Sequence, residues 1–401
     1  MKSGNPPTTS VPTTPVPMLD LERQYAPLRQ ELLAALGAVL DHRQFILGEP
    51  VALFEAAAAR QLGVQAAIGC SSGTDALWLA MAAAGIGPGD AVVTTPFSFF
   101  ASVSSILRAG ARPVLADIDP ASFNLSPAAV EAVLERPEAQ SVRALLPVHL
   151  YGQCVDWDGF LHLKQQRNLL LIEDAAQAWG ARWHQTSAGA LGDLAAFSFY
   201  PTKNLSAAGD AGLVTTDHAE FAERARMLRQ HGMRVRYHHD EVGWNARMDG
   251  FQGAILHVKL RYIDQWNEAR RVAAARYHHL FRAAGLVESG PYPQHGLVLP
   301  QQAAGQHHVW HQYVVRCAHR DALRSHLTQQ QIGSEIYYPL PLHRQTALAS
   351  LAYQEGDFPE AERAAREVLA LPIFPEITEH EQQTVVDAIA AFLSKPPAAV
   401  T

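Results

Sequence analysis

The stretch Ser198–Gly212 reads SFYPTKNLSAAGDAG. It continues an apolar run that begins AAF and leads into a second apolar run, LVTT. The first run predicts a buried strand that ends near Pro201, and Lys203 follows almost at once. A lysine just past a buried strand is partly desolvated, which lowers its pKa and makes it a better nucleophile. An isolated loop lysine is usually a solvated surface group, so the prediction depends on the rest of the chain.

Upstream of this stretch, short apolar runs alternate with segments of helical periodicity. That alternation predicts an α/β fold with a mainly parallel sheet covered on both faces, in which ligands collect at the carboxyl ends of the strands. We expect strands at residues 66–68, 91–95, 113–116, 144–148 and 169–172, and helices between them at 74–84, 100–109, 127–134 and 157–166.

The same spacing predicts helices at both ends of the chain and one long connecting helix, roughly from Gly250 to Ala283. That helix connects a large domain, expected at residues 18–265, to a smaller C-terminal α+β domain at 266–394. We expect loose tails at 1–17 and 395–401, because these segments are rich in Pro and small residues.

Composition excludes several classes of protein. The 401 residues are 48% hydrophobic and 18% charged, with a net charge of −7, which argues against a nucleic-acid binder. No apolar run reaches the ~20 residues that span a bilayer. Three widely spaced cysteines indicate neither disulfides nor zinc and fit a cytoplasmic location. The histidines at 307, 308 and 311 lack a complete ligand set, so we expect no metal.

Two motifs early in the chain suit a phosphate and an aromatic ring. Ser71–Leu77, SSGTDAL, follows the first expected strand, and such a turn presents free backbone N–H groups to an anion. Its Ser and Thr residues are equally ordinary helix N-caps. Thr95–Phe100, TPFSFF, places three aromatic residues at a strand end. We interpret two of them as core and one as a face on which a ring stacks.

A third motif, Leu169–Gly180 or LLLIEDAAQAWG, delivers Glu173 and Asp174 at the end of a buried strand. A carboxylate there is costly unless it meets a cation, and the protonated nitrogen of a pyridine ring is such a cation. Alternatively, one carboxylate caps the segment that follows. The chain thus carries, in order, a turn suited to a phosphate, an aromatic face for a ring, a buried carboxylate and Lys203. This order predicts a pyridoxal 5′-phosphate (PLP) site.

These motifs, together with GWNARMDGFQGAIL and YYPLPLH, resemble the DegT/StrS-type sugar aminotransferases. The resemblance covers about residues 18–393 and implies the type I PLP-transferase fold of aspartate aminotransferase, with a mainly parallel sheet of about seven strands. It implies that Lys203 forms the internal aldimine and then moves the proton between the substrate carbon and the cofactor. Asp174 would pair with the pyridine nitrogen, and Phe100 would stack on the ring.

The resemblance also implies the remaining site residues. Asn245, in a Gly-x-Asn-x-Arg motif, would reach the phosphate of a partner subunit, which implies an obligate homodimer with shared active sites. The others are Gly73, Thr74 and Ser198 at the phosphate, Gln177 beside the ring, and Tyr337 and His343 near the sugar.

The implied reaction is a ping-pong transamination. L-Glutamate would give its amino group to PLP, and the resulting pyridoxamine 5′-phosphate (PMP) would pass it to a dTDP-keto-6-deoxyhexose. The sequence YPTKNL with GDAG resembles the subgroup that aminates C-3, although Ser206–Ala208 replaces its usual Gly-Ala-Leu. Relatives that act at C-4 often carry a His after the Ser-Phe pair. The basic loop at 234–240 would meet the nucleotide diphosphate or be solvated.

Three alternatives stay open. The first is a C-4 or UDP-sugar aminotransferase of the same family. The second is a PMP-dependent dehydratase on the same fold, but those relatives carry histidine in place of the lysine. The third, from another class, is a non-catalytic PLP-binding regulator, against which the intact Lys203 and Asp174 weigh.

Overall fold

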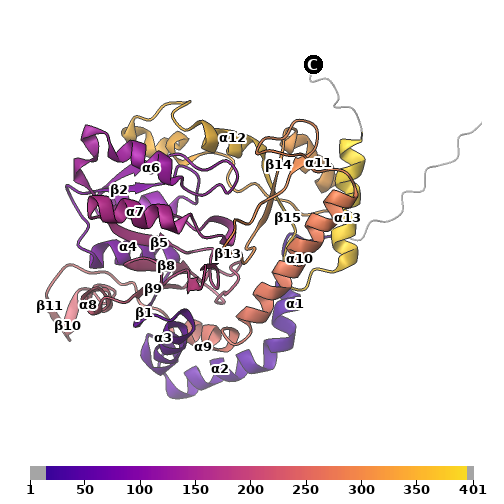
Figure 1. Cartoon of the computed structure of the whole chain (residues 1–401). Helices are drawn as coiled ribbons and strands as arrows, with labels where there is room; N and C mark the ends of the chain where they lie inside the picture. The colour runs from indigo at the N-terminus through magenta and orange to yellow at the C-terminus, as the bar shows by residue number, and fades with distance from the viewer. Residues whose placement is uncertain (1–14, 395–401) are drawn as a thin grey trace, which may run out of the picture.

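The computed structural model describes residues 15–394 (Figure 1), so residues 1–14 of the tail expected at 1–17, and the whole tail expected at 395–401, lie outside the described residues. Its largest element is a seven-stranded sheet of order β1-β9-β8-β5-β4-β2-β3. Only β9 runs antiparallel to its two neighbours, and the other pairs are parallel, which confirms the predicted sheet. The strands are β1 Ala66–Cys70, β2 Ala91–Thr94, β3 Arg112–Leu115, β4 Val142–Leu145, β5 Leu170–Asp174, β8 Leu194–Ser198 and β9 Gly212–Thr216.

Helices cover both faces of this sheet because successive side chains of each buried strand point to opposite faces. In β5, Leu171 packs into a core formed with α6 and α7, whereas Ile172 packs into a core formed with α4 and α8. The covering helices are α4 Gly73–Ala83, α5 Ala101–Arg108, α6 Pro127–Leu134, α7 Trp157–Arg167 and α8 Ala219–Leu228. The four helices predicted between the strands lie within a few residues of their predicted bounds, and α8 lies close to the helix that the sequence predicts near Glu220–Gln230.

A second sheet, antiparallel and of order β12-β14-β15, lies in the C-terminal part of the chain beside α10 and α13 (Figure 1). The elements are α10 Ile263–Ala283, β12 Leu297–Val298, β14 Tyr313–Cys317, α11 Arg320–Gln329, α12 Pro359–Glu367, β15 Val368–Leu371 and α13 Glu379–Leu393. The domain boundary at 265/266 falls in the first turn of α10 and stays a prediction.

The remaining α-helices are α1 Leu21–Tyr25, α2 Arg29–His42, α3 Gly48–Leu62 and α9 Gly250–Lys259. The remaining strands are short: β6 Arg182–Trp183, β7 Thr186–Ser187, β10 Met233–Val235, β11 His238–His239 and β13 Gln306–His307. The 3₁₀ helices are Ala26–Leu28, Pro137–Ser141, Leu150–Gly152, Leu342–Arg344 and Thr346–Leu351. Among residues 15–394, no helix combines the length and apolar character that crossing a bilayer requires.

The single helix predicted from Gly250 to Ala283 is wrong, because the chain forms two helices there, α9 and α10. Between them, the N–H of Arg261 bonds to the carbonyl of Val258 and that of Tyr262 to the carbonyl of Lys259, so the helix tightens and turns. The turn lets α9 pack on α2 and α3 while α10 runs to the second sheet (Figure 1). No Gly or Pro marks this break in the sequence.

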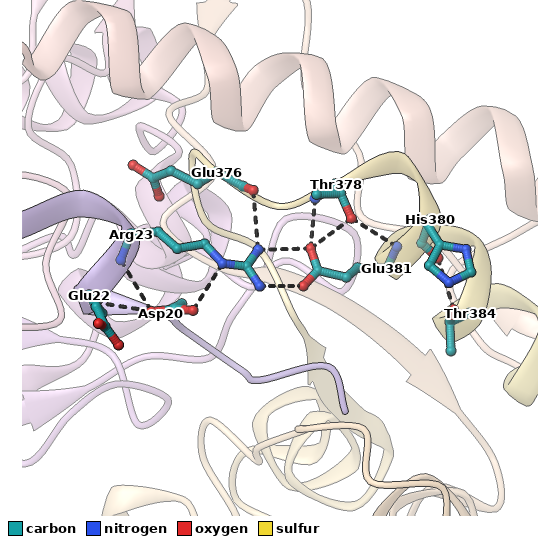
Figure 2. Close-up of polar contacts among 8 residues, drawn as sticks. All are labelled: Asp20, Glu22, Arg23, Glu376, Thr378, His380, Glu381 and Thr384. Atoms are coloured by element: carbon teal, nitrogen blue, oxygen red, sulfur yellow. Dashed lines mark hydrogen bonds and ion pairs between the residues drawn. The ribbon is translucent and has the colours of Figure 1, made fainter. Parts of the chain in front are cut away.

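The N-terminal segment is fastened to the C-terminal part of the fold. Val16, part of the expected loose tail, is only 2% exposed and exchanges backbone hydrogen bonds with Gln331 and Gly333. Arg23 of α1 forms a fork with Glu381 of α13, with N–O distances of 2.7 and 3.0 Å (Figure 2). Glu381 also closes a capping box with Thr378. The two ends of the chain are therefore joined by a charged, directional contact.

We predict that Arg23→Met lowers the free energy of unfolding at pH 7 by about 1–2 kcal/mol, because it removes a bidentate pair that is partly open to solvent. The Arg23 hydrogen bonds lower the pKa of Glu381 to about 2. The ion pair therefore stabilises the fold fully above the ordinary carboxyl pKa of 4.5 and loses that contribution as the pH falls towards 2. Denaturant midpoints at pH 7 and pH 3 measure this, and an equal loss at both pH values would mean that packing, not charge, is responsible.

Candidate active site

Lys203 lies in the turn that follows β8. Its N–H donates to the carbonyl of Tyr200 at 2.8 Å, which closes the turn, and its side chain is half-buried. Burial lowers the pKa of Lys203 to about 8, and the negative charge of Asp174 opposes this shift. At pH 7 roughly a tenth of the side chain is therefore a neutral amine, far more than for an ordinary lysine, and this is the form that acts as nucleophile or base.

Asp174 ends β5, the parallel neighbour of β8, and pairs in register with Ala196. Its carboxylate is 3% exposed and accepts hydrogen bonds from the Ser102 hydroxyl at 2.7 Å and from the N–H of Ala176 at 3.2 Å. Burial raises the pKa of Asp174, while these two donors and Lys203 hold it down. A buried carboxylate with so few donors is well suited to a cationic ring nitrogen.

The adjacent Glu173 has a different role. It is completely buried and lies 2.9 Å from Nε2 of His149, whose Nδ1 accepts from the N–H of Val155, so Nε2 carries the proton toward Glu173. Its two oxygens also accept from the backbone N–H groups of Gly189, Leu191 and Gly192 at 2.7–2.9 Å. Glu173 therefore organises the loop before β8, and only Asp174 is left for a ligand.

Three chain segments meet at the amino end of α4. A Cβ added to Gly73 would lie 2.5 Å from Cβ of Ser198, and one added to Gly212 would lie 2.2 Å from the carbonyl oxygen of Ser72. Glycine is therefore required at both positions. The first-turn N–H groups of Gly73 and Thr74 have no acceptor within the helix, and the Ser198 hydroxyl lies beside them. This arrangement suits a phosphate.

The capping interpretation of the same motif also holds. The hydroxyl of Ser72 accepts from the N–H of Asp75 at 3.1 Å, so Ser72 is the N-cap of α4. Asp75 itself accepts from the Ser71 hydroxyl and forms an ion pair with Arg108. Because the positive charge of Arg108 neutralises the Asp75 carboxylate, the positive end of the α4 dipole can still attract an anion.

Gln177 links the sheet to the C-terminal segment YYP. Its side-chain oxygen accepts from the N–H of Tyr151 at 2.7 Å, and its amide nitrogen donates to the Tyr338 hydroxyl at 3.2 Å. The Tyr151 hydroxyl in turn bonds to the carbonyl of Tyr337. Tyr337 and Gln177 are therefore brought together. The ring centroid of Tyr338 lies 6.4 Å from that of Phe99. No spacing in the sequence predicts that Tyr338 lies at this site.

The chain matches the model of the DegT/DnrJ/EryC1/StrS aminotransferase family over residues 27–390. The chain belongs to this family. It is 46% identical to the "Pleiotropic regulatory protein" of Geobacillus stearothermophilus, covering 94% of this chain and 98% of that protein. Two further relatives are the UDP-N-acetyl-3-dehydro-α-D-glucosamine 3-aminotransferase of Acidithiobacillus ferrooxidans (41%, 94% and 97%) and the dTDP-3-amino-3,4,6-trideoxy-α-D-glucose transaminase of Streptomyces venezuelae (42%, 94% and 96%).

Similarity to solved structures supports the assignment of the chain to this family. The chain superposes on DesV of S. venezuelae, solved with a ketimine intermediate, with a TM-score of 0.90 and 41% identity over 96% of this chain and 100% of DesV. It superposes on NtdA of Bacillus subtilis, solved with bound PMP, with a TM-score of 0.85 and 27% identity over 97% and 87% of the chains. The protein is therefore a PLP-dependent aminotransferase of this family with the type I fold.

The residues of this aminotransferase fit the cofactor. The glycine-lined turn at α4, the buried Asp174 and the half-buried Lys203 supply an anion cradle, a partner for a ring cation and an amine. Phe100 is the N-cap of α5 and is half-buried, as a ring-stacking residue must be, and Phe97 is core. The expectation that two of the three aromatics are core is wrong for Phe99, which is 61% exposed.

Two predicted residues lie apart from this group. The His343 side chain is completely buried, with Nε2 3.0 Å from Glu362 and its ring against Phe358. Its place near the sugar stays a prediction. Asn245 is exposed and accepts from Nε of Arg247 at 3.0 Å, in a segment that runs beside the end of β1. Its reach to a partner subunit stays a prediction.

Sequence reasoning missed two supports of the site. Ser102, the donor to Asp174, is one of three serines in α5, and no motif marks it among them. Asn204 follows Lys203 and bonds to Asn267 at 2.8 Å, to the Val309 carbonyl at 3.0 Å and to His311 at 3.1 Å. His311, one of the three histidines considered as metal ligands, is thus engaged with Asn204. Among the side chains that the structure describes, no cluster of potential metal ligands forms.

Proposed function

We propose that this aminotransferase moves an amino group from L-glutamate to C-3 of a dTDP-3-keto-6-deoxyhexose, with PLP bound at Lys203. The observation that carries the proposal is the placement of Lys203, whose pKa is lowered to about 8, and of the buried Asp174 at the ends of neighbouring strands, where their charges interact. When bound, the cofactor supplies an electron sink for the carbon that loses a proton. We also propose a cytoplasmic location.

Each residue then has one task. Asp174 would hold the positive ring nitrogen, and the hydrogen bond from Ser102 favours the ionised form of that carboxylate. Lys203 would hold the cofactor covalently, and its neutral amine would serve as the base that carries the proton to and from the substrate carbon. Backbone N–H groups of Gly73 and Thr74, with the Ser198 hydroxyl, would hold the phosphate, and Phe100 and Gln177 would flank the ring.

A homodimer is part of this proposal. Large apolar side chains are exposed on α2, α3 and the loop between them, and again on the segment around the β10–β11 hairpin: Leu33, Leu40, Phe45, Ile46, Leu53, Val235, Tyr237, Val242 and Trp244. A second copy of the chain would cover such surfaces. Asn245 follows the second group directly, which is where a residue that serves a partner's site would lie.

The names of related proteins bear on which sugar accepts the amino group. The names of two relatives specify amination at C-3, one on a dTDP sugar and one on a UDP sugar, which favours C-3 and leaves the nucleotide open. The alternative class, a PLP-binding regulator, has support in the name of the Geobacillus relative. The catalytic proposal is favoured because Lys203 and Asp174 are both present and adjacent.

The half-reactions test this assignment. The purified protein is converted to its PMP form with glutamate, the glutamate is removed, and keto sugars are added singly. We expect the visible absorption of the PLP form to return with the dTDP-3-keto-6-deoxyhexose and not with the 4-keto isomer. Return with the 4-keto sugar alone would move the reaction to C-4, and return with the UDP-3-keto sugar alone would change the nucleotide. No return with any of them would favour the regulator.

We predict that Ser102→Ala weakens PLP retention about tenfold, because a hydrogen bond to a charged group is lost. Without that donor the pKa of Asp174 rises further, so the defect is larger at pH 6 than at pH 9. PLP titration at both pH values measures it. Ser105→Ala is the matched control, since this buried hydroxyl of the same helix bonds only to the carbonyls of Ala101 and Ser102. Equal effects of the two changes would contradict the role of Ser102.

A further inference from the structure

Lys259, the last residue of α9, is a completely buried lysine that the proposed reaction does not use. Its amino group donates to the Ser206 hydroxyl at 2.6 Å and to the Tyr25 hydroxyl at 3.2 Å, and it lies 4.4 Å from the centroid of the Tyr25 ring. Among the side chains that the structure describes, no carboxylate forms an ion pair with it. A buried amino group held by hydroxyls and ring faces is costly to keep in place.

Both hydroxyl contacts lead to the segment that carries Lys203. Ser206 lies three residues after Lys203, and the Tyr25 hydroxyl donates to the carbonyl of Ala207 at 3.3 Å. Lys259 therefore holds two successive residues of the loop between β8 and β9, one directly and one through Tyr25. Ser206 and Ala207 are themselves completely buried, so this part of the loop has little freedom to rearrange.

The anchors of this loop alternate along the chain. Asn204 is held by Asn267 of α10, Ser206 by Lys259 of α9, and the N–H of Ala208 by the Gln252 side chain of α9 at 3.0 Å. Three helix-borne side chains therefore hold the loop at residues 204, 206 and 208, and Lys259 supplies the central contact.

Burial lowers the pKa of Lys259 to about 7, and the negative charge of Glu376 opposes this shift. The titratable groups that face its amino group are Tyr25 from α1 and Glu376 from the segment before α13; Trp266 of α10 presents a ring face at 5.7 Å. The amine can donate to Ser206 in either protonation state, so the anchor persists across neutral pH.

We propose that Lys259 is a positioning residue for Lys203: through Ser206 and Tyr25 it fixes the 204–208 loop and thereby the orientation of the Lys203 amine. The anchoring half of this statement depends only on the contacts described above. The half that concerns Lys203 rests on the proposed function. The two halves require separate measurements.

The first measurement is amide hydrogen exchange over residues 203–209, made with and without PLP, in wild type, Lys259→Met, Ser206→Ala and the double variant. Lys164→Met, which removes a partly exposed lysine paired with Asp193, is the control. We expect exchange at least ~10-fold faster in Lys259→Met and in the double variant, a smaller increase in Ser206→Ala, and none in the control. The double variant should resemble Lys259→Met, because the two residues act as a unit.

The second measurement is the pH midpoint of the visible absorption of the PLP form. We expect Lys259→Met to move it by at least ~0.5 unit and to lower kcat with little change in KM, because the amine is misplaced and substrate binding is not. A purely structural lysine would change the melting temperature and leave this midpoint alone. If Lys259→Met does not fold, Ser206→Ala gives the same readouts.

The outcomes separate the two halves. Unchanged exchange in both Lys259→Met and Ser206→Ala would overturn the anchor, whatever the cofactor does. Faster exchange with an unmoved pH midpoint would overturn the link to Lys203. If wild type showed no visible absorption with PLP, the role of Lys203 in the proposed function would fail, while the exchange data would still decide the anchor.

Discussion

Lys203→Ala is expected to reduce transamination at least ~10³-fold, because the change removes both the amine that holds the cofactor and the base that moves the proton. The fold should survive, since Lys203 makes no described side-chain hydrogen bond and its neighbours Asn204 and Ser206 keep the loop in place. Steady-state turnover and the thermal midpoint of the cofactor-free protein are the two measurements.

Lys203→Arg is the matched variant. Arginine keeps a positive charge near Asp174, but it stays protonated at every accessible pH and cannot act as a nucleophile. We therefore expect Arg to be as inactive as Ala. Turnover within tenfold of wild type in either variant would show that Lys203 is not the essential amine. Loss of activity together with loss of the folded state would leave Lys203 as a structural residue only.

Asp174→Asn is expected to reduce turnover about 10³-fold without lowering the melting temperature. The neutral amide cannot hold a ring cation, so the cofactor loses the protonated nitrogen that makes it an electron sink. Stability should be kept or rise slightly, because burial already raises the pKa of Asp174 and the folded state gains by losing that charge. Turnover, PLP affinity and thermal melting test this.

Glu173→Gln provides the comparison, because it is the same isosteric change one residue earlier. Both oxygens of Glu173 accept hydrogen bonds, from His149 and from backbone N–H groups of the loop before β8. In Glu173→Gln the side-chain NH2 group would replace one of these oxygens and would face an N–H donor. We expect a loss of about 3–5 kcal/mol in the free energy of unfolding, the cost of breaking a buried pair. If the two variants showed the reverse pattern, the assignment of the two carboxylates would be exchanged.

Much of the sheet could be predicted from the sequence because buried parallel strands are short apolar runs separated by helical periods. The same patterns predicted where β5 and β8 end, and therefore that Asp174 and Lys203 lie near each other. The strand β9 was predicted from the apolar run after the loop that carries Lys203. These features depend on local patterns, which is why sequence reasoning reached them.

The rest depended on contacts distant in the sequence. The choice between Glu173 and Asp174 is made by His149 and by residues 189–192, which no spacing links to them. The break between α9 and α10 has no Gly or Pro. His343 is buried because Glu362 and Phe358 close over it, and Lys259 anchors a loop 53 residues away. Periodicity does not encode such pairings.

The most direct test of the account is to locate the lysine that carries the cofactor. The chain has five lysines, at positions 2, 164, 203, 259 and 395, so peptide mapping after borohydride reduction of the PLP-loaded protein is decisive. We predict one equivalent of reduced cofactor, all of it on Lys203 and none on the buried Lys259. Cofactor on any other lysine, or none retained, would contradict the proposed active site.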